Sequence, residues 1–345
     1  MKYINTLYFL LFQFILQAQQ NWNMELSALY NTVRVHNEDQ LIKDGWKTIG
    51  LAISKETDGS KLWQQWHRYP QMGLLFRYKT FGNAAVMGSS YILLPYLEFT
   101  PFSYKKFALK IRHGTGLAFM NKIYNEEKNN ENIFVSTHLN AATFLNVAFS
   151  YQVHKQWMIL AGGDLSHESN GRLTVPNKGI NAVSLYVGLR YRASQRVTAR
   201  TKSDLPVVQK PWQAIINTAI GMSDYDFISR HMHFRPDIMA TAAYQHSGRF
   251  RTFLGPGMVF QKYDTLNNRL YLCIGEEVLI GRISTKYAIG YYLDSYASRT
   301  FFKIGMCYYP FIPKNGNAKG FYIGSNLKAH KFIADFVELN VGYVF

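Results

Sequence analysis

Apolar residues alternate with polar or small ones along most of this chain, at the two-residue period of a β-strand. In the segment 283–294, Ile283 and Tyr291 lie on one face while Lys286 and Asp294 lie on the other. Two further segments show the same alternation, 143–154 and 181–192. A chain with this pattern must bury or cover one apolar sheet face, so we expect an all-β protein.

The composition narrows the class of β protein. Charged residues make up 17% of the chain, below the ~25% usual in soluble domains, and aromatic residues make up 16%. That aromatic content excludes a disordered chain, and two cysteines are too few for a disulfide scaffold. Beyond the N-terminus, no run reaches the ~18 apolar residues of a membrane helix. Alternating strands of about ten residues are typical of an outer-membrane barrel.

The C-terminus supports a barrel more specifically. Val337, Leu339, Val341, Tyr343 and the terminal Phe345 form an unbroken apolar row on one strand face. This row resembles the C-terminal signature that the barrel-insertion machinery recognises in outer-membrane proteins. We therefore expect that machinery to be a partner of the chain.

The N-terminus predicts export. Lys2 precedes an apolar stretch at 7–16, and Ala18 provides a small residue for cleavage, which together form a short signal-peptide pattern. We assign residues 1–18 to this signal. In an oxidising compartment Cys273 and Cys307 could pair, but the sequence does not decide whether they do.

We predict one antiparallel transmembrane β-barrel over residues 19–345, with about 14 strands and a range of roughly 8 to 16. The expected strands are 71–79, 84–95, 106–118, 138–153, 156–169, 181–192, 212–222, 236–246, 250–261, 269–279, 283–294, 300–309, 319–329 and 333–345, with room for two more within 24–54. The polar stretch 193–210 is long for a periplasmic turn, and we see no linker to a second domain.

The candidate chemistry lies on the hairpin predicted at 156–192. A period of two puts His167 and Ser169 on the apolar, lipid-facing side of the first strand, and puts Asp164 and Glu168 on the other side. If the connecting loop is symmetric about Val175, Ser169 lies opposite Asn181. His167, Ser169 and Asn181 then converge on the outer wall of the barrel.

This convergence suits nucleophilic acyl transfer. A serine needs a base to take its proton, and an imidazole needs a third group to fix its orientation. Donors for an oxyanion are also nearby in the sequence, at Asn170, Gly171 and Asn177. The alternative interpretation is an ordinary extracellular turn, because Asn-Gly and Pro-Asn-Lys-Gly are common turn sequences.

The motif resembles the lipid A 3-O-deacylases, the PagL-type acyloxyacyl hydrolases of Gram-negative outer membranes. That family carries His-x-Ser-Asn, then Pro-Asn-x-Gly, then a carboxylate. The matching residues here are His167, Ser169, Asn170, Pro176, Asn177 and Gly179. The resemblance implies Ser169 as the nucleophile, His167 as the general base and asparagines around the oxyanion. It also implies lipid A, or lipopolysaccharide, as substrate and no metal or other cofactor.

Two departures from the family matter. Asn181 stands where the family has a glutamate, so it can accept the imidazole N–H but carries no charge to stabilise an imidazolium. The resemblance covers roughly residues 105–192, and familiar members are barrels about half as long. The C-terminal strands are therefore not accounted for by it.

Other interpretations remain open. The chain could be a non-catalytic outer-membrane channel or surface-binding barrel, or a secreted β-sandwich. Arg172 and Lys178 are weaker candidates for binding phosphates of lipopolysaccharide. His231 and His233 have the spacing of a metal pair but no second ligand cluster. A net charge of +16, scattered through the expected loops, favours anionic lipid over nucleic acid.

Overall fold

The computed structural model describes residues 22–34, 45–193, 200–224, 232–260, 268–294, 299–311, 318–330 and 333–345. Within these residues the chain forms sixteen antiparallel strands, β1 to β16, and one short helix, α2 (Leu62–Trp66). The predicted signal at 1–18 lies outside the described residues. Among those described, no helix is long and apolar enough to cross a bilayer.

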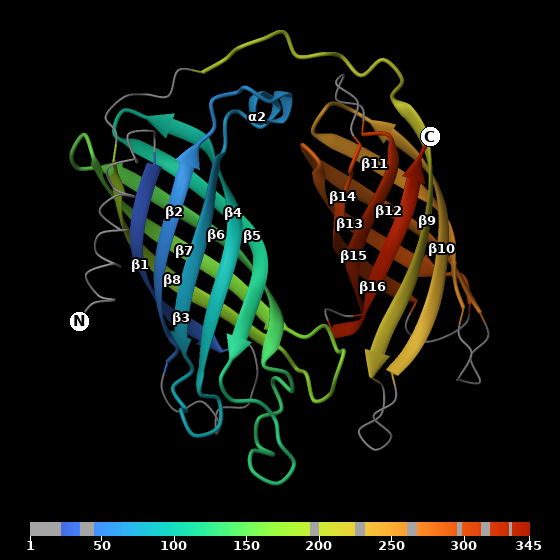
Figure 1. The fold of residues 1–345 in the computed structure, drawn as a ribbon, viewed down its shortest axis with the longest axis horizontal. Helices are drawn as coiled ribbons and strands as arrows, with labels where there is room; N and C mark the ends of the chain where they lie inside the picture. Colours follow the sequence, from blue (N-terminus) through green and yellow to red (C-terminus); the bar gives the residue numbers. More distant parts are fainter. Residues whose placement is uncertain are drawn as a thin grey trace, which may run out of the picture. The chain divides into compact units, whose positions relative to one another are not determined.

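The first eight strands close into a barrel in chain order, because β8 pairs with β1 (Figure 1). Their bounds are β1 (Trp22–Arg34), β2 (Lys47–Glu56), β3 (Gln71–Thr80), β4 (Ser89–Tyr104), β5 (Phe107–Met120), β6 (Leu139–Gln152), β7 (Trp157–Ser169) and β8 (Ile180–Arg192).

The last eight strands close into a second barrel, in which β16 returns to β9. Their bounds are β9 (Trp212–Asp224), β10 (Met232–Gln245), β11 (Phe250–Val259), β12 (Arg269–Ile280), β13 (Ile283–Tyr292), β14 (Thr300–Tyr308), β15 (Gly320–His330) and β16 (Ile333–Val344).

The all-β antiparallel barrel predicted from the sequence is confirmed, but the single barrel of about 14 strands is replaced by two barrels of eight. The expectation that no linker separates a second domain was wrong. The stretch 193–210, which did not fit as a periplasmic turn, connects the end of β8 to the start of β9. A two-residue period identifies strands but does not tell which strands close on one another, so it could not reveal the division.

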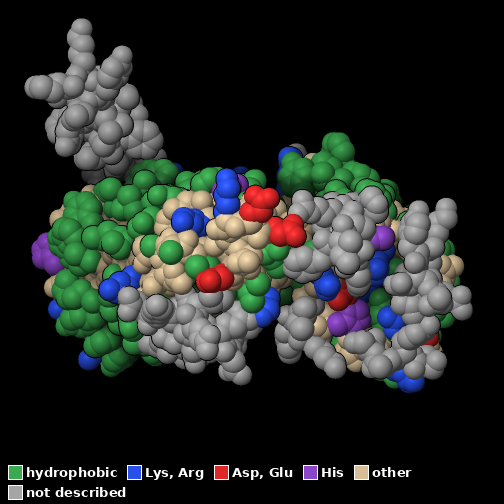
Figure 2. All heavy atoms as spheres, turned by 90° about the horizontal axis from the view of Figure 1, so that it is seen from below, with side chains coloured by type: hydrophobic (Ala, Val, Ile, Leu, Met, Phe, Trp, Pro, Cys, Tyr) green, Lys and Arg blue, Asp and Glu red, His purple; other side chains and the backbone are tan. Residues whose placement is uncertain are grey.

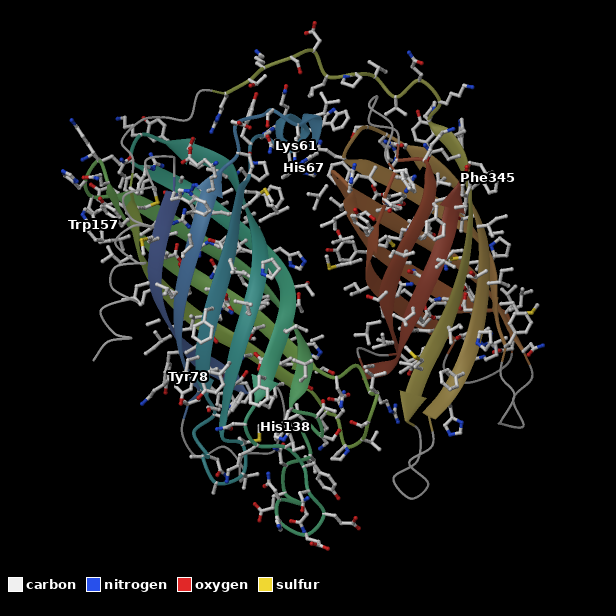
Figure 3. The ribbon with its side chains drawn as sticks, viewed as in Figure 1. Lys61, His67, Tyr78, His138, Trp157 and Phe345 are labelled. Carbon is white, nitrogen blue, oxygen red and sulfur yellow. The ribbon has the colours of Figure 1, made fainter. Side chains whose placement is uncertain are left out.

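The outer wall of the first barrel is apolar across its middle and aromatic near both ends. Tyr78 packs against Tyr91 near one end, and Trp157 packs against Tyr191 near the other; Figure 3 shows Tyr78 and Trp157 at opposite ends of the barrel. Hydrophobic side chains also gather on the wall in the space-filling view of Figure 2. Such a band between aromatic girdles is the surface of a membrane-spanning barrel.

The connections orient the first barrel. At one end, β4 and β5 are joined by Lys105 and Lys106, and β6 and β7 by residues 153–156. The third connection at this end is 57–70, which includes α2, and the opposite end carries the connections 81–88, 121–138 and 170–179. Short turns face the periplasm in outer-membrane barrels, so Ser169, at the end of β7, lies at the extracellular end.

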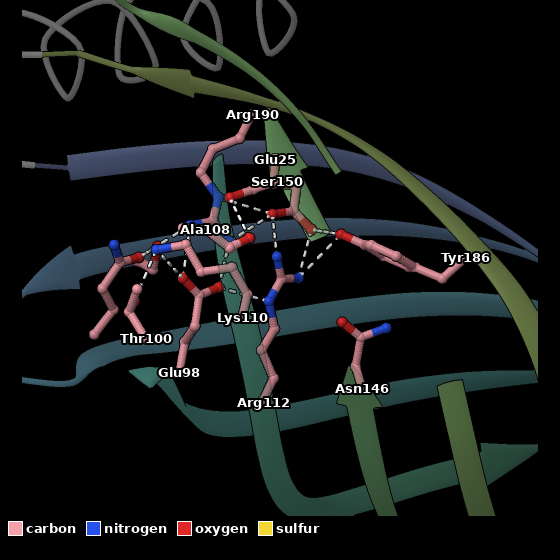
Figure 4. A network of polar contacts seen from close by, with 12 residues as sticks. Glu25, Glu98, Thr100, Ala108, Lys110, Arg112, Asn146, Ser150, Tyr186 and Arg190 are labelled. Carbon is pink, nitrogen blue, oxygen red and sulfur yellow. Dashed lines mark hydrogen bonds and ion pairs between the residues drawn. The ribbon is translucent and has the colours of Figure 1, made fainter. Parts of the chain in front are cut away.

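Charged side chains fill the interior of the first barrel. Arg112 donates to Glu98 at 2.6 Å and to both oxygens of Glu25 at 2.6 and 2.7 Å, while Arg190 bridges the same two carboxylates. Tyr186 also donates to Glu25, and Lys110 forms an ion pair with Glu98 at 3.4 Å, as Figure 4 shows. Three cations thus pair with two anions in a space shielded from water.

The interior of the second barrel is built in the same manner with different residues. Arg251 donates to Glu277 at 2.5 Å, and Lys303 forms ion pairs with Asp237 at 3.0 Å and Glu338 at 2.9 Å. An eight-stranded barrel is just wide enough for side chains to fill. Cys273 and Cys307 are buried free thiols, which settles the pairing question that the sequence left open.

The network in the first barrel generates a stability prediction. The substitution Arg112→Met leaves Glu25 and Glu98 buried without one of their cations, and should lower the free energy of unfolding by about 3–5 kcal/mol. Urea unfolding in lipid vesicles measures this loss. Arg192→Met is the matched control, because its ion pair with Glu56 is partly exposed and should contribute less than about 1 kcal/mol. Equal losses in the two variants would contradict the prediction.

Candidate functional site

His167 and Asn181 face each other directly on β7 and β8, and the His167 Nδ1 atom lies 2.7 Å from the Asn181 Oδ1 atom. Both side chains lie on the outer wall and are half-buried. Because Asn181 Oδ1 can only accept, Nδ1 carries the proton and donates it. The Nε2 atom is then left unprotonated in the neutral ring, as a general base requires.

The register of this hairpin differs from the symmetric loop that the sequence suggested. Asn181 lies opposite His167 rather than Ser169, so the pairing is centred on Thr174 instead of Val175. A shift of two residues keeps every side chain on its predicted face. His167, Ser169 and Asn181 therefore still share one face of the hairpin, and the contact recorded among them is the one between His167 and Asn181.

Ser169 follows His167 by two residues on the same strand, which puts the two Cα atoms about 6.5 Å apart. Gly179 lies against both of these side chains. A Cβ atom added to Gly179 would lie 3.0 Å from His167 Cε1 and 3.4 Å from Ser169 Cβ. Gly179 also has a φ of +70°, where a side chain is strained. Its N–H donates to Phe134 O at 3.0 Å, which anchors the start of β8.

The loop that follows Ser169 is held by Asn170. Its Nδ2 donates to Thr174 O at 3.1 Å and to Thr174 Oγ1 at 3.0 Å, and its Oδ1 accepts from Arg172 N at 2.8 Å. The Asn170 N–H points to Asn177 Oδ1 at 3.4 Å. The Asn170 side chain thus holds the loop together. From the sequence it was proposed as an oxyanion donor, and this role in the loop was not predicted.

The remaining predicted residues of this loop are distributed as follows. Gly171 is buried and Asn177 is half-buried, while Arg172 is half-buried with a φ of +66° and Lys178 is exposed. His231 lies outside the described residues. In the described part of the chain, no group of three or more His, Cys, Asp or Glu side chains is placed to hold a metal ion.

The inner face of β7 confirms the parity argument for the acidic residues. Asp164 accepts two hydrogen bonds from Arg77, at 3.0 and 2.6 Å, and Glu168 pairs with Lys79. Both carboxylates are buried inside the barrel, on the opposite side of the strand from His167. Within the described residues, no carboxylate contacts the His167 ring.

A polar row on the outer wall was not recognised from the sequence. Thr115 lies opposite Thr143, and Thr143 lies opposite His167, so the row runs from β5 to Asn181 on β8. The Thr115 and Thr143 hydroxyl oxygens are 3.2 Å apart. Strand parity would have placed both threonines on the lipid face, and their pairing with His167 required the register.

The row lies inside the apolar wall rather than at its edge. Leu117, Phe119 and Leu139 lie on its extracellular side and are 56%, 48% and 60% exposed. Leu145 and Leu165 lie on its other side. Hydroxyl, imidazole and amide groups at this depth face the acyl chains of the outer leaflet, where packing alone does not explain them.

These features define the class: an outer-membrane β-barrel protein with a polar site on its lipid-facing wall. The family model described as lipid A 3-O-deacylase (PagL) matches residues 47–190, from the start of β2 to the end of β8. Over these residues, which are fewer than half of the chain, the first barrel is similar to the PagL family. The match begins well before residue 105, where the sequence resemblance had been placed, and it ends before the second barrel.

Searches for other relatives add little. No curated protein matches the chain. Three engineered variants of the porin of Rhodopseudomonas blastica match at 12%, 11% and 11% identity, each over 94% of this chain and 99% of that chain, with TM-scores of 0.20, 0.19 and 0.19. Similarities with such low TM-scores carry no structural conclusion.

The His167–Asn181 contact predicts a tautomer. Neutral His167 should be protonated at Nδ1 and unprotonated at Nε2, because Nδ1 donates to Asn181. Nitrogen-15 NMR of histidine-labelled protein distinguishes the two tautomers, and His167→Gln assigns the signal. In Asn181→Leu, which removes the acceptor, the preference should be lost. A proton on Nε2 in the wild-type ring would contradict the geometry.

Proposed function

We propose that the first barrel removes an ester-linked acyl chain from lipid A by a Ser-His mechanism. The observation that carries this proposal is the direct pairing of His167 with Asn181 on the outer wall, beside Ser169 and within the matched PagL segment. A site on that wall meets its substrate in the outer leaflet of the membrane, without passage through the filled interior.

In the proposed mechanism, His167 Nε2 takes the Ser169 proton as Oγ attacks the ester carbonyl carbon. The carbonyl oxygen becomes an oxyanion, for which Gly171 N–H and the Asn177 amide are our proposed donors. The intermediate then collapses, and His167 gives its proton to the departing sugar oxygen. Water, deprotonated by His167, then attacks the acyl-serine carbonyl. As the bond to Ser169 Oγ breaks and the fatty acid leaves, His167 returns the proton to that oxygen.

The polar row suggests how the substrate is held. A lipid A acyl chain that lies against β5 and β6 would place its polar groups beside Thr115 and Thr143, so we assign these threonines to substrate binding. Arg172 and Lys178 remain proposed contacts for the lipid A phosphates.

The alternative of a channel or surface-binding barrel receives less support. Buried arginine, lysine and glutamate side chains occupy the interior of each barrel, and eight strands leave little further room. No described feature of the chain favours a pore.

Mass spectrometry of lipid A incubated with the detergent-folded protein tests the activity. Wild type should remove one acyl chain, whereas Ser169→Ala and His167→Ala should remove none, because the first lacks the nucleophile and the second lacks the base. Folding of both variants is checked by their heat-dependent mobility on gels. Equal activity in folded Ser169→Ala would exclude the serine mechanism.

Asn181 provides a second prediction. Asn181→Asp keeps the size of the side chain and adds the negative charge that stabilises an imidazolium, so it should raise kcat by on the order of tenfold or more. Asn181→Leu, which cannot accept the Nδ1 proton, should lower kcat. Initial rates of fatty-acid release measure both changes. A lower kcat in Asn181→Asp would show that this amide is not a weakened form of the usual carboxylate.

A further inference from the structure

The outer wall of the second barrel carries a carboxylate that the proposed deacylase does not use. Glu276 lies on β12 at an outward position and is half-buried. Exposed apolar side chains lie on both sides of it along the wall, with Ile274 52% exposed and Ile283 43% exposed. The cost of a charge on a lipid-facing wall falls towards the membrane interface, and a cationic ligand would offset what remains of it.

The neighbouring residue, Glu277, shows how a carboxylate in the interior of this barrel is paired. Glu277 faces the interior, where it accepts from Arg251 at 2.5 Å and from Tyr309 at 2.7 Å. Glu276 forms no ion pair with any lysine or arginine among the described residues. The charge of Glu277 is therefore paired with a cation of the same barrel, whereas that of Glu276 is not paired with a lysine or arginine among the described residues.

The Glu276 carboxylate is nevertheless held in a defined position. Thr252 lies directly opposite on β11, and its Oγ1 donates to Glu276 Oε2 at 2.5 Å. His246 Nε2 lies 2.7 Å from the same Oγ1. Because the single hydroxyl proton is given to Glu276, His246 donates through Nε2. This series of hydrogen bonds fixes one carboxylate oxygen, Oε2. Among the described residues, no hydrogen bond to the other oxygen, Oε1, is recorded.

Aromatic side chains continue the cross-strand row on either side of the Thr252–Glu276 pair. Tyr287 lies opposite Glu276 on β13, and Tyr244 lies opposite Thr252 on β10. Trp212, which is 70% exposed, lies opposite Tyr244 on β9. Such a row is an aromatic girdle, and girdles mark the level of the lipid headgroups.

The connections indicate which leaflet this girdle meets. β10 and β11 are joined by residues 246–249, and β12 and β13 by Gly281 and Arg282. The third connection at this end is 309–319, and the opposite end carries 225–231, 260–268, 293–299 and 331–332. Because two of its three connections are short turns, we assign this end to the periplasm. Glu276 lies four residues before the end of β12, or about 13 Å along the strand, so it meets the inner leaflet of the outer membrane.

We propose that Glu276, with Tyr244, Tyr287 and Thr252, binds the primary ammonium headgroup of a phospholipid in that leaflet. An ammonium can donate a charge-assisted hydrogen bond to Oε1 and lie against the faces of the flanking tyrosine rings. An anionic headgroup is repelled by the carboxylate. A quaternary ammonium has no N–H to donate, so it retains the ring contacts but loses the hydrogen bond.

Native mass spectrometry of the full chain tests this site. The folded protein is released from detergent containing equal amounts of phosphatidylethanolamine, phosphatidylcholine and phosphatidylglycerol with identical acyl chains. Wild type should retain the ethanolamine lipid about tenfold over the choline lipid, equivalent to about 1.4 kcal/mol. Glu276→Gln should lose this preference. Ser325→Ala is the matched control, because it removes another outward, exposed polar group of the same barrel and should keep the preference.

Several outcomes would overturn the proposal. Equal retention of the ethanolamine and choline lipids by wild type would do so, as would preferred retention of the anionic lipid or an unchanged preference in folded Glu276→Gln. If Glu276→Gln fails to fold, wild type alone decides the matter. Retention should fall stepwise as the ethanolamine nitrogen is methylated once, twice and three times, and a flat series would refute an N–H contact with Oε1.

Discussion

The bilayer requires that every backbone N–H and C=O group within it be paired by the chain itself. Both sets of eight strands meet this requirement by closure, β8 onto β1 and β16 onto β9. Closure at eight strands also determines the character of the outer wall and of the interior of each barrel. The wall must be apolar, and the narrow interior must be filled, which Arg112 and Arg190 do only because Glu25 and Glu98 neutralise them.

A filled interior leaves the outer wall as the place for chemistry on a membrane lipid. His167, Asn181 and the threonines of the polar row occupy positions that would otherwise be apolar, and the ion pairs of Arg77 and Lys79 hold β7 from the opposite side. The inward carboxylates of β7 therefore serve the fold rather than the imidazole. Because these carboxylates face inward, the uncharged Asn181 is the partner of His167. Asn181 can orient the imidazole, but it carries no charge to stabilise an imidazolium.

Much of this could be predicted from the sequence, because strand parity is a local property. The alternation placed His167 and Ser169 outside and Asp164 and Glu168 inside, and the structure agrees. Register was predicted less well, since the loop after Ser169 is shaped by Asn170 rather than by symmetry. Pairings between distant strands, such as Thr143 with His167 or β8 with β1, depend on closure. No local pattern encodes closure, so the polar row and the division into two barrels were missed.

Each barrel has an even number of strands, so each begins and ends on the same side of the membrane. The connection from β8 to β9 therefore never has to cross the bilayer. An eight-stranded unit can be appended to another by a polar tether alone, without changing the topology of the enzyme-like half or the side on which its hairpin emerges. The length of this chain therefore reflects two complete eight-stranded units, not one enlarged barrel.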